Sequence, residues 1–181
     1  MKILAFAASI SPVSINNQLV RYAASVIRDK VSPQANIEFL DLNDYMMPFY
    51  RPDIEEQNGV PQQAHDFRAK ISEADAIMIS FAEHNGFYTA AYKNTFDWAS
   101  RIDGKVYQNK PTILLATSPG RGGASNVLAL AAKSAEHFGM DVLGHLSVPS
   151  FNHSFDKENN QLTDTHLDAK LLAILELLKA N

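Results

Sequence analysis

The chain of 181 residues contains no cysteine. This absence excludes disulfides, thiolate metal sites, cysteine nucleophiles and cysteine-ligated iron–sulfur clusters, so any redox chemistry requires an added cofactor. The six histidines are scattered without the spacing of a metal site such as H-E-x-x-H, and no metal is expected. The G-x-S-x-G elbow of many serine hydrolases is also missing, which makes that chemistry a poor fit.

The sequence also lacks a basic segment and a long apolar one. Its formal net charge is −4, and no run of Lys and Arg offers a surface for phosphodiester backbones, so nucleic acid is not an expected partner. No apolar stretch approaches the ~20 residues that span a bilayer. Because the first apolar run, residues 3–8, is too short for an export signal, we expect a soluble cytoplasmic protein without membrane contact.

The rest of the composition is that of a globular protein, with 46% hydrophobic and 20% charged residues. The length predicts a single domain over residues 1–181. Short apolar segments predict five buried strands, at residues 3–8, 37–42, 76–81, 112–117 and, more weakly, 142–146. Helical spacing of apolar residues predicts five helices, at residues 16–29, 65–72, 90–102, 125–138 and 164–179.

This alternation of strand and helix predicts a parallel sheet with helices on both faces. We expect a flavodoxin-like three-layer sandwich with five strands in the order 2-1-3-4-5. Ligands of such sheets lie outside the carboxyl ends of the strands, where the strand order reverses beside strands one and three. The long proline-containing stretches 43–61 and 147–162 are expected to cover the surface or surround the site.

The loop after the first strand, residues 9–17 (the first loop), has the character of an anion site. It places serine hydroxyls and asparagine amides just before a helix, where unpaired backbone N–H groups and the helix dipole favour a phosphate. The alternative is that Ser14 or Asn16 only caps the helix. The loop has neither G-x-G-x-x-G nor the Gly-Lys-Ser/Thr of a P-loop, so a mononucleotide phosphate without Mg²⁺ is preferred.

Two further loops make the pattern specific. Residues 82–86 (the second loop) and the following helix contain Glu83, Asn85, Lys93, Asn94, Asp97 and Trp98. They match in identity and spacing the P-E-Y-N and L-K-N-x-x-D-W patterns of the NADPH-dependent FMN reductases, which this chain resembles. The first loop matches the spacing of that family's G-S-x-R-x-x-S-x-N, and residues 118–123 (the third loop) supply its glycine-rich loop. The resemblance covers residues 3 to about 146.

The resemblance implies a non-covalently bound FMN held by all three loops. The first loop would surround the phosphate through Ser9, Ser11, Ser14, Ile15 and Asn16. The second would line the isoalloxazine, mainly through backbone groups of Ala82, Glu83, His84, Asn85 and Gly86. The third would approach from the other side through Ser118, Gly120, Arg121, Gly122 and Gly123, where missing β-carbons allow close backbone contact.

The sequence departs from the family pattern at three positions. Ser11 stands where the family has its phosphate-binding Arg, so a dianion would depend on hydroxyls and backbone donors. His84 replaces a Tyr, and Ala82 replaces a Pro. Arg121 is a candidate for the phosphate of NADPH.

Several aromatic residues near these motifs have open roles. Asp97 and Trp98, with Lys93 and Asn94, favour a role in the fold or a dimer over a catalytic one, since buried Trp usually serves packing. Phe87, Tyr88 and Tyr92 fit stacking near the flavin or a subunit interface equally well. Phe49 and Tyr50 are candidates to reach the site of a neighbouring subunit.

The function that the resemblance implies is an FMN-dependent NAD(P)H oxidoreductase. Hydride would pass from the co-substrate NAD(P)H through FMN to a small-molecule acceptor: a quinone, azo compound, metal oxyanion or free flavin. No catalytic side chain is required, because the cofactor carries the chemistry, and Asn85 is the candidate donor near flavin N5. A flavodoxin-type electron carrier and a flavin-binding regulatory module remain alternatives. A homodimer or homotetramer is also implied, with the site completed by the neighbouring subunit.

Overall fold

Five parallel strands form the central sheet of the computed structural model, which describes residues 1–180. Their order across the sheet is β2-β1-β3-β6-β7. This is the predicted order 2-1-3-4-5, because β4 and β5 form a separate hairpin outside the sheet. The strands are β2 (Asn36–Phe39), β1 (Lys2–Ala8), β3 (Ala76–Phe81), β6 (Lys110–Thr117) and β7 (Met140–Val148).

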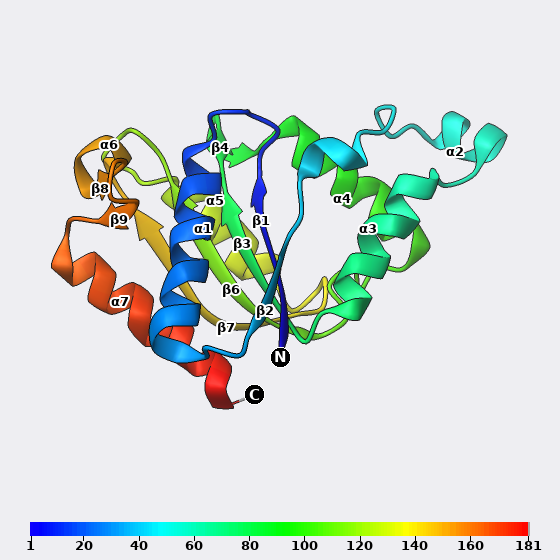
Figure 1. Ribbon diagram of the computed structural model, residues 1–181. Helices are drawn as coiled ribbons and strands as arrows, with labels where there is room; N and C mark the ends of the chain where they lie inside the picture. The colour runs from blue at the N-terminus through cyan, green and yellow to red at the C-terminus, as the bar shows by residue number, and fades with distance from the viewer. Residues whose placement is uncertain (181) are drawn as a thin grey trace.

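Helices cover both faces of the sheet, which confirms the predicted three-layer sandwich (Figure 1). Successive residues of β3 point to opposite faces: Met78 packs in one core, and Ile77 and Ile79 pack in the other. The first core lies under α1 (Ile15–Val26) and α7 (Thr165–Glu176). The second lies under α3 (Gln62–Glu73), α4 (Ala90–Ile102) and α5 (Ser125–Ser134).

The second predicted strand, residues 37–42, runs three residues past the observed end of β2 and begins one residue late. The strand ends at Phe39, because the carboxylate of Asp41 accepts a hydrogen bond from the N–H of Asn43 at 2.9 Å and starts a short 3-10 helix, η2 (Leu42–Tyr45). Leu42 is therefore buried as part of a helical turn instead of a strand.

Several helices also begin or end at residues other than those predicted. The first helix passes after Val26 into a π-helical turn, η1 (Ile27–Val31). The helix predicted over residues 125–138 ends at Ser134, and the turns that follow it close at Gly139 with φ of 75°. The last helix begins after Asp164 and finishes in a 3-10 turn, η3 (Leu177–Ala180).

The stretches predicted to be long loops contain short elements. The first holds α2 (Pro52–Asn58), a helix with no buried residue that projects beyond α3 and α4 in Figure 1. The second holds α6 (Phe151–Ser154) and a hairpin of β8 (Phe155–Asp156) and β9 (Gln161–Leu162). Both stretches run over the carboxyl side of the sheet, as expected.

Candidate functional site

Asn16 joins the start of α1 to the ends of two strands at the carboxyl edge of the sheet. It is the second residue of α1, and only 2% of its surface is exposed. Its Oδ1 accepts hydrogen bonds from the Ser80 hydroxyl at 2.8 Å and the Thr117 N–H at 3.1 Å, and its Nδ2 donates to the Thr117 carbonyl at 3.1 Å. The start of α1, the end of β3 and the end of β6 are therefore locked together.

These hydrogen bonds limit which atoms of Asn16 remain available to a ligand. Its Oδ1 accepts two bonds and its Nδ2 donates one inside the protein, so we expect its contribution to a bound anion to come mainly from the backbone N–H in the first turn of α1. Sequence reasoning missed the partner Ser80. The available signal was a hydroxyl within the otherwise apolar strand β3, since a buried hydroxyl needs a hydrogen-bond partner.

The first loop presents neutral donors in a row. Three serine hydroxyls each accept one backbone N–H bond, at 3.2, 3.4 and 3.2 Å: Ser9 from Ser11, Ser11 from Val13, and Ser14 from Asn17. Each hydroxyl keeps its own proton to donate. Ser14 is the N-cap of α1, which was the alternative interpretation of the sequence, and no acidic residue lies in the first turn. The loop therefore fits an anion, and no carboxylate of α1 competes for its N–H groups.

The second loop is the tip of a hairpin that the sequence analysis did not predict. Its strands are β4 (Glu83–His84) and β5 (Phe87–Tyr88), joined by Asn85 and Gly86 with φ of 53° and 85°. Two positive φ angles are what a two-residue turn needs to match the twist of its strands, and Asn-Gly is the strongest sequence signal for it. Asn85 is thus at the tip of a defined turn.

The carboxylate of Glu83 connects this hairpin to α5. Glu83 Oε2 accepts a hydrogen bond from the N–H of Val127, in the first turn of the helix, at 2.9 Å. The N-cap residue Ala124 has no side-chain cap of its own. Glu83 therefore caps α5 from outside and holds the second loop beside the third.

The third loop packs on the segment after β7. Gly123 has φ of 58°, and a Cβ there would collide with Ser147 Oγ and lie 2.9 Å from Pro149 N. The Ser147 hydroxyl donates to the Gly123 carbonyl at 2.8 Å. This glycine is required by the chain itself, whereas a Cβ at Gly122 would have no atom within 4 Å and would face open space.

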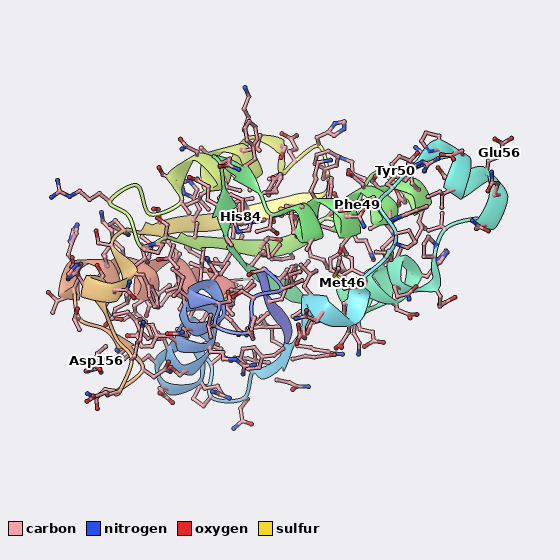
Figure 2. The ribbon with its side chains drawn as sticks, turned by 90° about the horizontal axis from the view of Figure 1, so that it is seen from above. Met46, Phe49, Tyr50, Glu56, His84 and Asp156 are labelled. Carbon is pink, nitrogen blue, oxygen red and sulfur yellow. The ribbon has the colours of Figure 1, made fainter. Side chains whose placement is uncertain are left out.

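These contacts bring most of the predicted site residues around one hollow of about 260 Å³ at the carboxyl edge. From the predicted set it is lined by Ser9, Ser11, Ser14, Ile15, Asn16, Ala82, Glu83, His84 and Ser118, with Val13, Thr117 and Pro119 in addition. Asn85, Gly86, Gly120, Arg121, Gly122 and Gly123 are outside this lining. Figure 2 views this edge from above, with His84 beside the centre of the molecule.

The residues Asn94 and Trp98 of α4 hold the segment 47–50. Asn94 Oδ1 accepts from the Tyr50 N–H at 2.9 Å, and its Nδ2 donates to the carbonyls of Met47 and Pro48 at 3.0 and 3.1 Å. Trp98 is fully buried, and its Nε1 donates to the Pro48 carbonyl at 2.7 Å. These two residues have the role in the fold that the sequence favoured. Phe49 is left 74% exposed (Figure 2).

The aromatic residues after the second loop divide between core and surface. Tyr92 is buried and hydrogen-bonds the hydroxyl of Tyr107, and burial raises the pKa of both phenols far above the ordinary value. Both stay neutral near neutral pH. Tyr88 packs on Tyr92, while Phe87 is 66% exposed. A separate apolar hollow of about 540 Å³ between α4 and α5 is lined by Phe87, Tyr88, Tyr92 and Phe96, among others.

The sheet order and the loops at its carboxyl edge define a flavodoxin-like protein. A family model described as NADPH-dependent FMN reductase matches residues 1–153, and the chain belongs to that family. This confirms the resemblance. The solved structure of FerB, described as a flavoenzyme NAD(P)H:(acceptor) oxidoreductase from Paracoccus denitrificans, has a TM-score of 0.75. It is 21% identical, with 99% of this chain and 97% of FerB covered, and supports the fold.

Two relatives in sequence bear related names. An NADPH:quinone oxidoreductase of Arabidopsis thaliana is 32% identical over 123 residues, which are 68% of this chain and 61% of that protein. An NAD(P)H-dependent FMN reductase of Pseudomonas aeruginosa is 26% identical over 166 residues, covering 91% of this chain and 86% of that protein. The chain thus matches about three fifths of the length of its plant relative. Among residues 1–180, no helix is long and apolar enough to cross a membrane.

Proposed function

We propose that the protein binds FMN non-covalently at the carboxyl edge of the sheet and uses NAD(P)H to reduce a small-molecule acceptor: a quinone, azo compound, metal oxyanion or free flavin. The observation that carries the proposal is the junction at Asn16, which gathers the three loops around one hollow, with the neutral donors of the first loop on its phosphate side. Family membership favours reductase activity over an electron carrier or a regulatory module.

The first loop is assigned to the phosphate. The hydroxyls of Ser9, Ser11 and Ser14 would donate to its oxygens, together with the N–H groups of Ile15 and Asn16 at the positive end of α1. The hollow of about 260 Å³ suits the phosphate and the chain attached to it, so the flat ring system would rest on the second and third loops.

The chemistry itself belongs to the cofactor. Bound FMN supplies hydride acceptance at N5 and its transfer to the acceptor. The protein binds and orients: Asn85 at the hairpin tip is assigned as the donor near N5, and the backbone of residues 118–123 is assigned to the pyrimidine side. Arg121, which has no ion pair among residues 1–180, is the candidate for the phosphate of NADPH.

The test follows the absorbance of flavin. Purified protein loaded with FMN is mixed with NADPH or NADH without oxygen, and the oxidised-flavin band is expected to bleach and then recover when a quinone is added. A bound flavin that neither nucleotide reduces would contradict the reductase proposal and favour the carrier.

A pair of variants locates the site. Ser9→Asp puts a negative charge in the first loop and is expected to weaken FMN binding at least about tenfold, since two like charges at close range repel strongly. Ser72→Asp makes the same change on the exposed end of α3, at the other edge of the sheet, and is expected to change nothing. Equal behaviour of the two variants would count against this location.

The proposal includes an assembly of two or four copies in the cytoplasm. Met46 and Phe49 lie three residues apart in one segment and are both exposed, which supports a contact with another copy, because neighbouring large apolar side chains on a surface mark interaction sites. Sedimentation of the purified protein as a monomer at micromolar concentration would contradict it.

A further inference from the structure

The first loop has no positively charged side chain to balance the FMN phosphate assigned to it. The phosphate of FMN carries close to two negative charges at neutral pH, while the loop offers only hydroxyls and backbone N–H groups. Two hollows border the loop: the one of about 260 Å³ described above, and one of about 70 Å³ on its other side. Among all residues that line the two, Arg21 is the only Lys or Arg.

Arg21 is held in place beside the first turn of α1. Its Nε donates to Asn17 Oδ1, one turn earlier in the helix, at 2.9 Å. Its Cζ lies 4.4 Å from the centre of the Phe39 ring, which adds a cation–π contact. The guanidinium is thus fixed from two sides. Asn17 is itself part of the first loop, and its N–H is bound to the cap residue Ser14.

The charge of Arg21 is not neutralised by a contact within the protein. No carboxylate among residues 1–180 forms an ion pair with it. Asp41 lines the same small hollow, but its Oδ1 accepts from the backbone N–H and from Nδ2 of Asn43, at 2.9 and 2.8 Å. Nδ2 of Asn43 also donates to the Ile10 carbonyl at 3.4 Å, which keeps this acid engaged with the loop backbone.

We infer that Arg21 supplies the positive charge for the FMN phosphate from behind the first loop and so selects the phosphorylated flavin over riboflavin. Arg21 follows Asn17 of the first loop by one helical turn, so its charge acts within the Debye length of ~8–10 Å, where ordinary salt screens it only in part. The inference rests on the proposed function, and it makes Arg21 a positioning and specificity residue that acts through Asn17 and through its field.

The test compares two flavins that differ only in the phosphate. Arg21→Gln removes the charge and retains a polar chain that can still bond Asn17. We expect the dissociation constant of FMN, measured by quenching of flavin fluorescence, to rise about fivefold to tenfold, and that of riboflavin to stay within about twofold. Raising the salt concentration should shrink the difference between variant and wild type for FMN alone.

Arg28→Gln is the matched control. Arg28 lies in η1, at the far end of the same helical segment, is exposed, and has the same charge. Its loss should leave both flavins within about twofold of the wild type, since its distance exceeds a Debye length. If Arg28→Gln weakens FMN binding as much as Arg21→Gln, the effect belongs to net charge and the inference is overturned.

Two more variants separate charge from packing. Arg21→Lys keeps the charge and is expected to retain most of the FMN affinity, whereas an affinity as low as that of Arg21→Gln would show that only shape matters. Ser11→Arg puts a cation inside the loop, so the penalty of Arg21→Gln should largely vanish in that background. Thermal unfolding of each variant checks the fold.

The outcomes keep this inference apart from the proposed function. A wild-type protein that binds neither flavin contradicts the proposed function. A wild-type protein that binds FMN tightly, with Arg21→Gln weakening both flavins equally or neither of them, leaves the proposed function standing and refutes the role of Arg21.

Discussion

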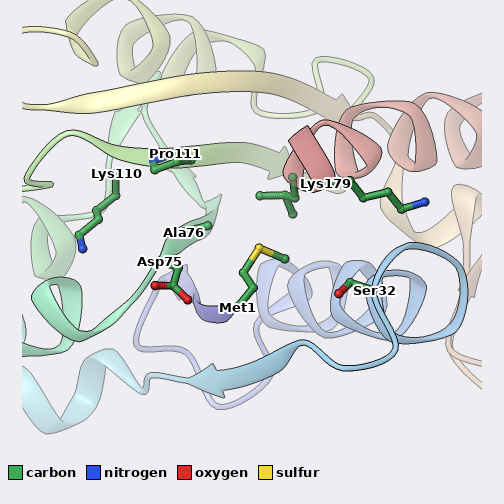
Figure 3. Close-up of a pocket in the computed structure, with 8 residues that line it drawn as sticks. Met1, Ser32, Asp75, Ala76, Lys110, Pro111 and Lys179 are labelled. Atoms are coloured by element: carbon green, nitrogen blue, oxygen red, sulfur yellow. The ribbon is translucent and has the colours of Figure 1, made fainter. Parts of the chain in front are cut away.

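The two edges of the sheet each carry a hollow, and the larger one lies at the edge opposite the proposed site. The hollow at the amino edge measures about 580 Å³, against about 260 Å³ at the carboxyl edge. Figure 3 shows its lining, with Asp75, Lys110 and Met1 around the starts of the strands. Its charged groups bind the chain itself: Asp75 accepts from the Lys2 N–H at 2.6 Å, and Lys110 donates to the Ser72 carbonyl at 3.1 Å.

The chemical difference between the two edges follows from the direction of the strands. All five strands are parallel, so the crossover helices begin at the carboxyl edge and end at the amino edge. Helix starts expose N–H groups, and helix ends expose carbonyls. A phosphate therefore finds donors at the carboxyl edge, whereas the amino edge suits cations such as Lys110, which already occupies the end of α3. The proposed site therefore rests on the direction of unpaired donors and not on volume.

The largest expected effect comes from Gly123→Val at the carboxyl edge. The new Cβ would meet the backbone at Pro149, and a β-branched residue is strained at φ of 58°. We expect a loss of at least about 3 kcal/mol in the free energy of unfolding, measured by denaturant titration, and loss of FMN binding. Gly122→Ala is the control, because its position is open. Similar stabilities for the two variants would contradict the packing described.

The second effect concerns the junction of the loops. Asn16→Ala leaves the Ser80 hydroxyl and both backbone groups of Thr117 without their partner, and we expect a loss of about 3 kcal/mol in the free energy of unfolding. FMN affinity should fall as well. Asn17→Ala, an exposed neighbour, should cost less than about 1 kcal/mol. If Asn16→Ala proved as mild as Asn17→Ala, the three loops would not depend on this junction.

The third prediction concerns the hydrogen bond between Trp98 and the segment 47–50. Trp98→Phe keeps an aromatic ring in the core and removes the bond from Nε1 to the Pro48 carbonyl. We expect a loss of about 1–2 kcal/mol and faster protease cleavage in segment 47–50. Unchanged cleavage would show that Asn94 alone holds the segment.

The smallest expected effect comes from the ion pairs of Glu38, near the amino edge. Hydrogen bonds from Lys70 and Lys2 lower the pKa of Glu38 below its ordinary value of 4.5, so these contacts stabilise the fold above that pH and are lost as the pH falls through the lowered pKa. Glu38→Gln should reduce stability at pH 7 by no more than about 1 kcal/mol, because exposed ion pairs contribute little. Denaturant titrations at falling pH and at high salt should bring variant and wild type together, and FMN affinity should not change.

The sequence predicted the sheet because strand and helix alternate, and it predicted most of the lining of the hollow because the loop motifs are local. Other predicted residues, Asn85 and Arg121 among them, lie outside that lining. It could not predict that Asn16 turns inward, since the partners Ser80 and Thr117 are 64 and 101 residues away. The place of Arg21 on α1 likewise depends on Phe39, a residue of the separate strand β2. The hairpin at Asn85 and Gly86 could have been predicted from its Asn-Gly turn signal. It was not predicted, because these residues were interpreted only as part of the family's loop pattern.

The segment 47–50 has a thermodynamic consequence. Four hydrogen bonds, three donated by Asn94 and Trp98 and one accepted by Asn94, fix its backbone before any molecule arrives. A surface loop that orders only on binding loses conformational entropy at that moment, and the loss weakens the complex. Here the ordering is already complete in the folded chain. An apolar contact made by Phe49 would therefore retain nearly its full burial free energy, and its association would not wait for a loop to close.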